Sequence, residues 1–132
     1  MDRMIFVNLP VADVAAARHF YTGLGFTVNE QFSDDRGACI VVSDAIYVML
    51  LERSRFAGFA TLPVADARVT TGVITSLSTT SRDEADELLA RALAHGGTAG
   101  TELTEGGMYG HTFLDPDGHV WEVFHLAMPD RS

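Results

Sequence analysis

The chain has 132 residues, of which 47% are hydrophobic and 20% are charged, and this composition is typical of one ordinary globular domain. Its formal net charge of -9 at pH 7 would repel nucleic-acid phosphates and anionic membranes, so we exclude both as partners. The chain contains no lysine, which excludes Schiff-base chemistry and phosphate binding by a P-loop.

The cysteine content and the first residues of the chain bear on the cellular localisation of the protein. The single cysteine, Cys39, cannot form an internal disulfide, and it lies in the apolar segment ACIVV without a basic neighbour. We therefore expect a buried structural thiol. The first residues, MDRMIFVNLP, lack the long apolar run of a signal peptide or a membrane span. These features predict a cytoplasmic protein.

The first part of the chain has the pattern of a strand, a helix and three strands. The segment 4–11 (MIFVNLPV) has the β-branched and aromatic residues of a strand. Asp13 is a candidate N-cap for a short amphipathic helix, which the glycines at 23 and 25 end. Three strand-like segments separated by polar breaks follow, at residues 26–32, 38–42 and 45–51.

The same order repeats after a loop-like connector of about 20 residues, 52–71. Residues 72–79 are predicted to form a strand, and Ser81 with Glu84 forms a capping box for a second helix. Three strand candidates then follow, with the sequences TAGTEL, MYGHTFL and HVWEVFHL. GFTVNEQ after the first helix and GGTAGTE after the second occupy the same place at a lag of about 70 residues.

This repeat predicts an α+β fold made of two tandem βαβββ modules. The first module spans about 4–51 and the second about 72–126, within a single domain covering residues 1–132. Each helix can cover only one face of its own sheet, so the other face stays free. We expect the two free faces to form a cup-shaped mixed β-sheet with the helices outside, and the cup to bind a small molecule. Phe56 and Phe59 in the connector either close one mouth of this cup or pack on a partner subunit.

The order and spacing of several motifs resemble a known family. The motifs are HFYTGLGF in the first helix, AHGGT at the end of the second and FLDPDGHVWEV near the C-terminus. Together they resemble the vicinal oxygen chelate superfamily, which includes glyoxalase I, extradiol dioxygenases, and fosfomycin- and bleomycin-resistance proteins. The similarity extends from Met4 to His125. The segments IFVNLPV, NEQFSD, YVMLL, MYG and DPDGHVWEVF are similar to bacterial proteins named predicted lactoylglutathione lyases.

The resemblance implies a divalent metal held by four inward His, Glu or Gln side chains, one from the first and one from the last strand of each module. By position these ligands fall on Phe6, Met49, Ile74 and Glu122, with Leu50 replacing Met49 if the register shifts by one. Only Glu122 can bind a hard or borderline metal, whereas a methionine thioether suits Cu(I). We therefore expect no cofactor and no metal site, with Glu122 as the one retained candidate ligand.

Glu122 is the candidate general base. Period-2 alternation places Val120, Glu122 and Phe124 on one face of the last strand, and this face lines the cup if Trp121 and Val123 pack against the helix. A carboxylate in a cleft is often a site residue and can move a proton. The alternative is a glutamate that is exposed at an edge or paired with an arginine.

The residue opposite Glu122 depends on the length of the preceding hairpin loop. A three-residue loop, 116–118, places Thr112 opposite Glu122, whereas a two-residue loop, 116–117, places His111 there. We favour the longer loop because Pro-Asp-Gly suits a type I turn followed by a left-handed glycine. His111 then lies on the other face of the sheet.

Further residues are predicted to contact a ligand. Asn8 shares a face with Phe6, where its amide either binds a ligand or caps local backbone. The glycine-rich segment 105–111 is either a mobile lip or a plain β-connection. The complete set of predicted ligand-binding residues is Phe6, Asn8, Met49, Ile74, Ser76, Met108, Tyr109, His111, Thr112, Val120 and Phe124.

Two functions stay open at this point. One is a glyoxalase-type lyase or isomerase in which Glu122 moves the proton, although neither a Lewis acid nor an oxyanion site can be named. The other is non-catalytic binding of a partly aromatic drug-like molecule, as in the bleomycin-resistance branch. Extradiol dioxygenase chemistry ranks last, because its iron site of two histidines and a carboxylate is not available at the aligned positions. The resemblance also implies a homodimer, with the cup formed within one chain or by exchanged modules.

Overall fold

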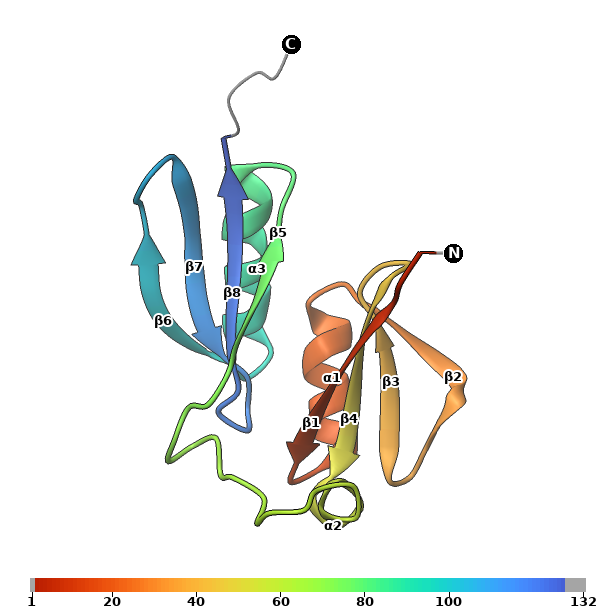
Figure 1. The fold of residues 1–132 in the computed structure, drawn as a ribbon. Coiled ribbons are helices and arrows are strands. Elements are labelled where there is room, and N and C mark those ends of the chain that lie inside the picture. Colours follow the sequence, from red (N-terminus) through yellow and green to blue (C-terminus); the bar gives the residue numbers. More distant parts are fainter. Residues whose placement is uncertain (1, 128–132) are drawn as a thin grey trace. The chain divides into compact units, whose positions relative to one another are not determined.

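The computed structural model describes residues 2–127. The chain divides into two compact units, one ending at Asp66 and the other beginning at Ala67. Each unit contains one four-stranded mixed sheet and one long helix that follows its first strand (Figure 1). The predicted α+β fold of two tandem βαβββ modules is therefore confirmed.

The sheet of the first unit has the strand order β1-β4-β3-β2. It consists of β1 (Ile5–Val11), β2 (Thr27–Asp34), β3 (Gly37–Val41) and β4 (Ile46–Glu52). The edge strand β1 pairs parallel with β4, whereas the pairs β3–β4 and β2–β3 are antiparallel. This parallel pair forms because the helix between β1 and β2 carries the chain back across the sheet.

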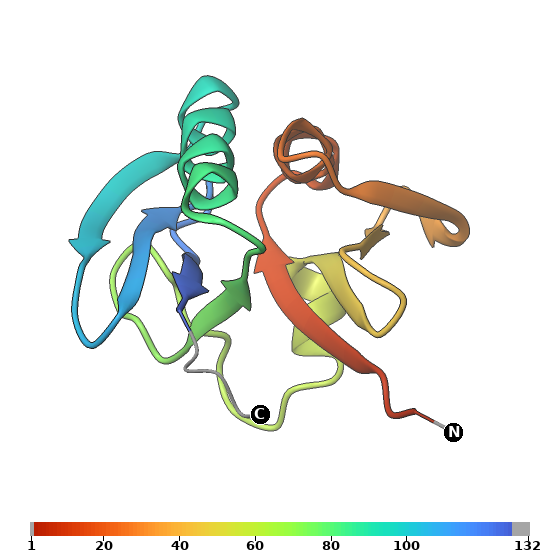
Figure 2. The same cartoon turned by 90° about the horizontal axis from the view of Figure 1, so that it is seen from above.

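The helix α1 (Val14–Gly23) covers one face of this sheet (Figure 2). The side chain of Asp13 accepts a hydrogen bond from the N–H of Ala16 at 3.1 Å, so Asp13 is the N-cap that the sequence predicts. The helix buries Ala17, Phe20 and Tyr21 against the sheet. Burial of these side chains provides most of the stabilisation of so short a helix.

The second unit repeats this arrangement with the strand order β5-β8-β7-β6. Its elements are β5 (Ile74–Ser78), α3 (Arg82–Ala94), β6 (Thr98–Leu103), β7 (Met108–Leu114) and β8 (Val120–Leu126). The hydroxyl of Ser81 accepts the N–H of Glu84 at 3.1 Å, as the capping box predicts. Helix α3 packs on β7 and β8, and Phe113, Trp121 and Val123 are buried there.

The connector contains a helix that the sequence pattern does not predict. Residues Arg53–Ala57 form the short helix α2, which contacts β1 and β4. The guanidinium of Arg53 donates to the carbonyls of Val64 and Ala65 at 3.2 and 3.3 Å, and so ties the connector back to the helix. Five residues are too few to show hydrophobic periodicity, so only these tertiary contacts define the helix. Within residues 2–127, no helix is both long and apolar enough to cross a membrane.

The strand pairings show that the two modules repeat residue by residue. In each module the first and last strands are parallel neighbours. On the face away from the long helix, two successive cross-strand residue pairs of the first module have counterparts in the second. These pairs are Phe6–Tyr47 and Asn8–Met49 in the first module, and Ile74–Val120 and Ser76–Glu122 in the second. Met49 and Glu122 therefore occupy equivalent positions. We call the face of each sheet that α1 or α3 leaves uncovered its open face.

Candidate functional site

The hairpin between β7 and β8 has the predicted three-residue loop. The N–H of Asp115 donates to the carbonyl of His119 at 2.9 Å, and Gly118 has a φ of 91°. The Asp115 carboxylate is buried and accepts the N–H groups of Asp117 and His119 at 3.0 and 2.8 Å. This register makes Thr112 the cross-strand partner of Glu122. The two-residue alternative is therefore excluded.

Glu122 lies on the open face of the second sheet. Trp121 and Val123 are each 1% exposed on the opposite face, which packs against α3, so alternation directs Glu122, Val120 and Phe124 away from the helix. Glu122 is half-buried. Within residues 2–127, no arginine forms an ion pair with its carboxylate.

A row of polar residues crosses this open face. Ser76 on β5 and Thr112 on β7 are the two cross-strand partners of Glu122. The Thr112 hydroxyl accepts the N–H of Thr101 at 2.7 Å and lies 3.0 Å from the Thr101 hydroxyl. A Cβ atom at Gly100 would lie 2.2 Å from the Thr112 hydroxyl, so this contact requires glycine there. The carboxylate of Glu122 thus has a hydroxyl residue on each neighbouring strand.

His111 and Tyr109 lie on the other face of β7 and contact α3. The Nε2 atom of His111 is 2.7 Å from Oδ1 of Asp86, and the Tyr109 hydroxyl donates to the same oxygen at 2.5 Å. The Arg82 guanidinium lies 5.0 Å from the centre of the Tyr109 ring. The hydrogen bonds from Tyr109 and then His111 lower the pKa of Asp86, and Asp86 raises the pKa of Tyr109. The structure therefore brings these two residues to Asp86 and not to Glu122.

The glycine-rich segment before His111 forms a tight turn in the structure. The N–H of Met108 donates to the carbonyl of Glu105 at 2.9 Å, and Gly106 and Gly107 have φ values of 61° and 79°. Met108 is the first residue of β7 and is half-buried. Glycine supplies the left-handed backbone that this turn needs, as expected for a β-connection. The role of the segment as a mobile lip over a ligand stays a prediction.

The open face of the first sheet carries aromatic and sulfur-containing side chains. The rings of Phe6 and Tyr47 stack with their centroids 4.7 Å apart and their planes 11° from parallel. Asn8 donates its amide N–H to the carbonyl of Phe6 at 3.2 Å. Met49 is the cross-strand partner of both Asn8 and Cys39. Cys39 is buried, and burial raises the pKa of its thiol, which supports the predicted structural role.

A pocket of about 350 Å³ lies within the first unit, where α2 approaches the sheet. Its lining residues come from β1, β4, and α2 with the turn that follows it; they are Asn8, Leu51, Phe56, Phe59 and Ala60. Leu51 is buried, whereas Phe59 is 79% exposed. Of these residues, the sequence predicts only Asn8 to contact a ligand. It predicts that the two phenylalanines close a mouth of the cup or pack on a partner subunit, and it indicates no role for Leu51 and Ala60. No sequence signal identifies these two, because the return of α2 onto the sheet brings them to Asn8.

The four positions that correspond to metal ligands do not offer a suitable donor set. The first module places Phe6 and Met49 there, and the second places Ile74 and Glu122. Phenylalanine and isoleucine have no donor atom, and a thioether is a soft ligand. In the part of the chain that the structure describes, no three His, Cys, Asp or Glu side chains cluster as metal ligands would. These residues do not fit a hard divalent ion.

Comparisons with known proteins agree with this architecture. Residues 3–123 match the model of the Glyoxalase/Bleomycin resistance protein/Dioxygenase superfamily, whereas no curated protein matches the chain. A hypothetical protein from S. aureus is 25% identical with a TM-score of 0.79, over 95% of this chain and 94% of that one.

Two further solved structures share the fold at lower identity. A glyoxalase/bleomycin resistance protein/dioxygenase family enzyme from Burkholderia phytofirmans PsJN is 17% identical with a TM-score of 0.78, over 96% of this chain and 100% of that one. A lactoylglutathione lyase from Agrobacterium tumefaciens is 19% identical with a TM-score of 0.70, over 95% and 94% of the two chains. The match over residues 3–123, together with the duplicated βαβββ topology, shows that the chain belongs to the Glyoxalase/Bleomycin resistance protein/Dioxygenase superfamily.

Proposed function

We propose that this protein binds a small, partly aromatic molecule, and that the pocket lined by Asn8, Leu51, Phe56, Phe59 and Ala60 takes part in this binding. The observation that carries the proposal is the pocket itself, whose volume of about 350 Å³ falls within the range of small-molecule sites. Its walls are apolar apart from one amide, and such a lining suits binding by burial of apolar surface.

The apolar lining residues would pack against a ligand, and the one amide would fix the orientation of the ligand by hydrogen bonding. Phe56 and Phe59 offer two rings against which a flat ligand can pack, and Leu51 forms an apolar floor. The Asn8 amide uses one N–H on the Phe6 carbonyl, so its second N–H and its carbonyl oxygen are available to a ligand hydroxyl or carbonyl. A neutral aromatic molecule with one polar group matches this arrangement.

A titration with 2-naphthol, a flat neutral aromatic that carries one hydroxyl, tests the proposal. We expect 2-naphthol to raise the melting temperature of the protein, and calorimetry to give a measurable Kd. The variant Phe56→Ala should weaken binding about ten-fold, which corresponds to about 1.4 kcal/mol. Phe32→Ala is the matched control, because Phe32 is 65% exposed on β2 and does not line the pocket. Equal affinities of the two variants would exclude this pocket.

A second candidate function is lyase or isomerase activity with Glu122 as the general base. The observation that favours it is the position of Glu122 on the open face between Ser76 and Thr112. Such a carboxylate could accept a proton from a carbon next to a substrate carbonyl. The donor set at the four ligand positions does not fit a metal that could polarise the substrate carbonyl, so we rank this function below binding.

An activity assay distinguishes the two functions. The purified protein is incubated with methylglyoxal and glutathione, with Ni, Zn, Co or Mn added in turn. We expect no turnover. Turnover that Glu122→Gln abolishes and Glu105→Gln preserves would establish the lyase instead, since Glu105 is an exposed residue in the turn before β7. From the family resemblance we also infer a cytoplasmic homodimer, whose mass light scattering would measure.

A further inference from the structure

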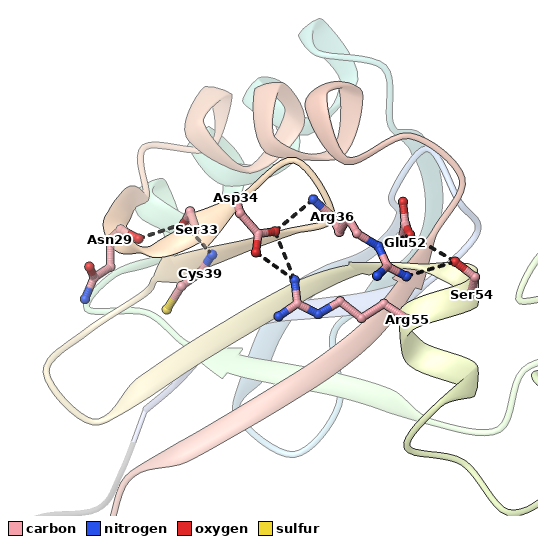
Figure 3. Close-up of polar contacts among 8 residues, drawn as sticks. All are labelled: Asn29, Ser33, Asp34, Arg36, Cys39, Glu52, Ser54 and Arg55. Carbon is pink, nitrogen blue, oxygen red and sulfur yellow. Dashed lines mark hydrogen bonds and ion pairs between the residues drawn. The ribbon is translucent and has the colours of Figure 1, made fainter.

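The helix that carries Phe56 into the pocket also carries an arginine that reaches across the sheet. Arg55 directs its Nη1 atom to both carboxylate oxygens of Asp34, at 2.9 and 3.0 Å (Figure 3). Asp34 is the last residue of β2, and β2 and α2 belong to distant parts of the sequence. The ion pair therefore joins α2 to the far edge of the first sheet.

Gly37 provides the space in which this ion pair forms. A Cβ atom at Gly37 would lie 3.4 Å from Nη1 of Arg55 and 3.0 Å from Cδ2 of Leu51. Gly37 and Leu51 are cross-strand partners on β3 and β4, and Leu51 lines the pocket. The Arg55 guanidinium thus lies beside the apolar floor of the pocket.

A second set of charged contacts holds the start of α2. The Arg36 guanidinium forms an ion pair with Glu52, the N-cap residue of α2, and the Ser54 hydroxyl donates to the same carboxylate at 2.9 Å. Asp34 also accepts the backbone N–H of Arg36 at 2.8 Å. The last residue of β2 therefore contacts the middle of α2, and the turn that follows β2 contacts its start.

We propose that Asp34 and Arg55 are positioning residues that hold α2 against the sheet and thereby set the affinity of the pocket for its ligand. This inference rests on the proposed binding function. A helix of five residues is not stable in isolation, so α2 stays in place only through its contacts. When it leaves the sheet it takes Phe56 with it, and the apparent Kd rises as the inverse of the fraction of molecules that keep the pocket.

The pair is partly exposed, with 37% of the Arg55 side chain and 59% of the Asp34 side chain accessible. Water and salt screen such a pair, so its removal should weaken binding by about two- to five-fold rather than abolish it. For the same reason, binding by the unmodified protein should weaken as the salt concentration rises. The variants that lack the pair should lose this part of the salt dependence.

The test is a double-mutant cycle on 2-naphthol binding, measured by calorimetry at low and high NaCl. The variants are Asp34→Asn, Arg55→Gln and the combination of both. Asp34→Asn is chosen because its amide oxygen can still accept the N–H of Arg36. We expect each single variant to weaken binding by about two- to five-fold and the double variant to weaken it no further.

The matched control is the ion pair of Arg18 and Glu30, whose closest atoms are 2.7 Å apart in the same unit and which does not contact α2. Arg18→Gln and Glu30→Gln should leave the Kd unchanged. An unchanged Kd in Asp34→Asn, with the unmodified protein binding, would overturn the inference. Equal losses in the Asp34 and Glu30 variants would show a general effect of charge and would overturn it as well.

A ligand-free measurement separates this inference from the proposed function. The N–H groups of Gly58 and Phe59 donate to carbonyls within α2 at 3.1 and 3.0 Å, and their hydrogen exchange reports on the helix itself. We expect faster exchange in Asp34→Asn than in Glu30→Gln. Equal exchange rates would refute the positioning role even if 2-naphthol binds, whereas faster exchange without binding would refute only the proposed ligand site.

Discussion

Glu122 on β8 and Thr112 on β7 are direct cross-strand partners on the open face of the second sheet, yet the Thr112 hydroxyl bonds to Thr101 on β6. Thr112 therefore fastens the edge strand β6, which pairs irregularly between Ala99 and Glu102. This contact gives Thr112 a structural role beside the candidate base. Its predicted role in ligand binding stays a prediction.

Replacing Thr112 by valine should destabilise the protein, because the N–H of Thr101 loses its acceptor. We expect Thr112→Val to lower the free energy of unfolding by about 1 kcal/mol, the usual contribution of one hydrogen bond. Urea denaturation measures this change. Thr104→Val, at an exposed site after β6, is the control, and an equal effect of both substitutions would contradict the proposed anchoring.

Gly110 should not tolerate even the smallest side chain. A Cβ atom there would lie 2.2 Å from the Val123 carbonyl oxygen and 2.8 Å from the Cα atom of Phe124. Backbone atoms of a central strand cannot move away easily, so Gly110→Ala should cost about 1–3 kcal/mol of unfolding free energy. At Gly72 no atom lies within 4 Å of the corresponding position. Gly72→Ala should therefore change thermal stability by less than about 0.5 kcal/mol, and equal losses in both variants would contradict the clash at Gly110.

Asp86 should make stability depend on pH in the acid range. The Tyr109 hydroxyl and His111 hydrogen-bond its carboxylate and lower its pKa from the ordinary value of 3.8. A lowered pKa in the folded state means that the stabilisation is complete above the unfolded pKa and is lost as the pH falls through the folded pKa. Asp86→Asn should be less stable than the unmodified protein at pH 6. The difference should begin to shrink below about pH 4, near the unfolded pKa, and should disappear once the pH has fallen through the lowered pKa of the folded state.

The alkaline range provides a second measurement on the same contact. Asp86 raises the pKa of Tyr109 from its ordinary value of 10.0, so the corresponding stabilisation is present below pH 10 and is lost as the pH rises through the folded pKa. Tyr109→Phe should remove this alkaline loss. Glu105→Gln serves as the control in both ranges. A pH-independent difference between Asp86→Asn and the unmodified protein would show that the carboxylate contributes nothing through its charge.

Removal of metal should leave the protein unchanged, because the donor set at the four ligand positions does not fit a divalent ion. We expect the same melting temperature before and after dialysis against EDTA. Elemental analysis of the purified protein should find no stoichiometric metal. One bound ion per chain, with a drop in melting temperature on chelation, would show that other residues supply the ligands.

Local sequence patterns predicted the parts of the fold that depend on interactions between residues close together in the chain. Asp13 precedes apolar residues at helical spacing, so its role as N-cap of α1 follows from hydrogen bonding within four residues. The three-residue loop 116–118 follows in the same way, since a glycine after proline and aspartate adopts a positive φ. Strand alternation then placed Trp121 and Glu122 on opposite faces of β8.

Contacts between residues that are distant in the sequence could not be predicted from local patterns and became known only from the tertiary structure. The side chains of Asn8, Leu51 and Phe56 meet in one pocket only because β1 pairs with β4 and because α2, too short to be stable alone, is held by Asp34 and Val64. His111 and Tyr109 likewise bind Asp86 because helix packing selects the face of β7 on which they lie. The sequence by itself determined the duplicated modules and the turn chemistry, which depend on neighbouring residues. Only the tertiary structure decided which side chains share a site, since long-range packing, rather than any local pattern, brings them together.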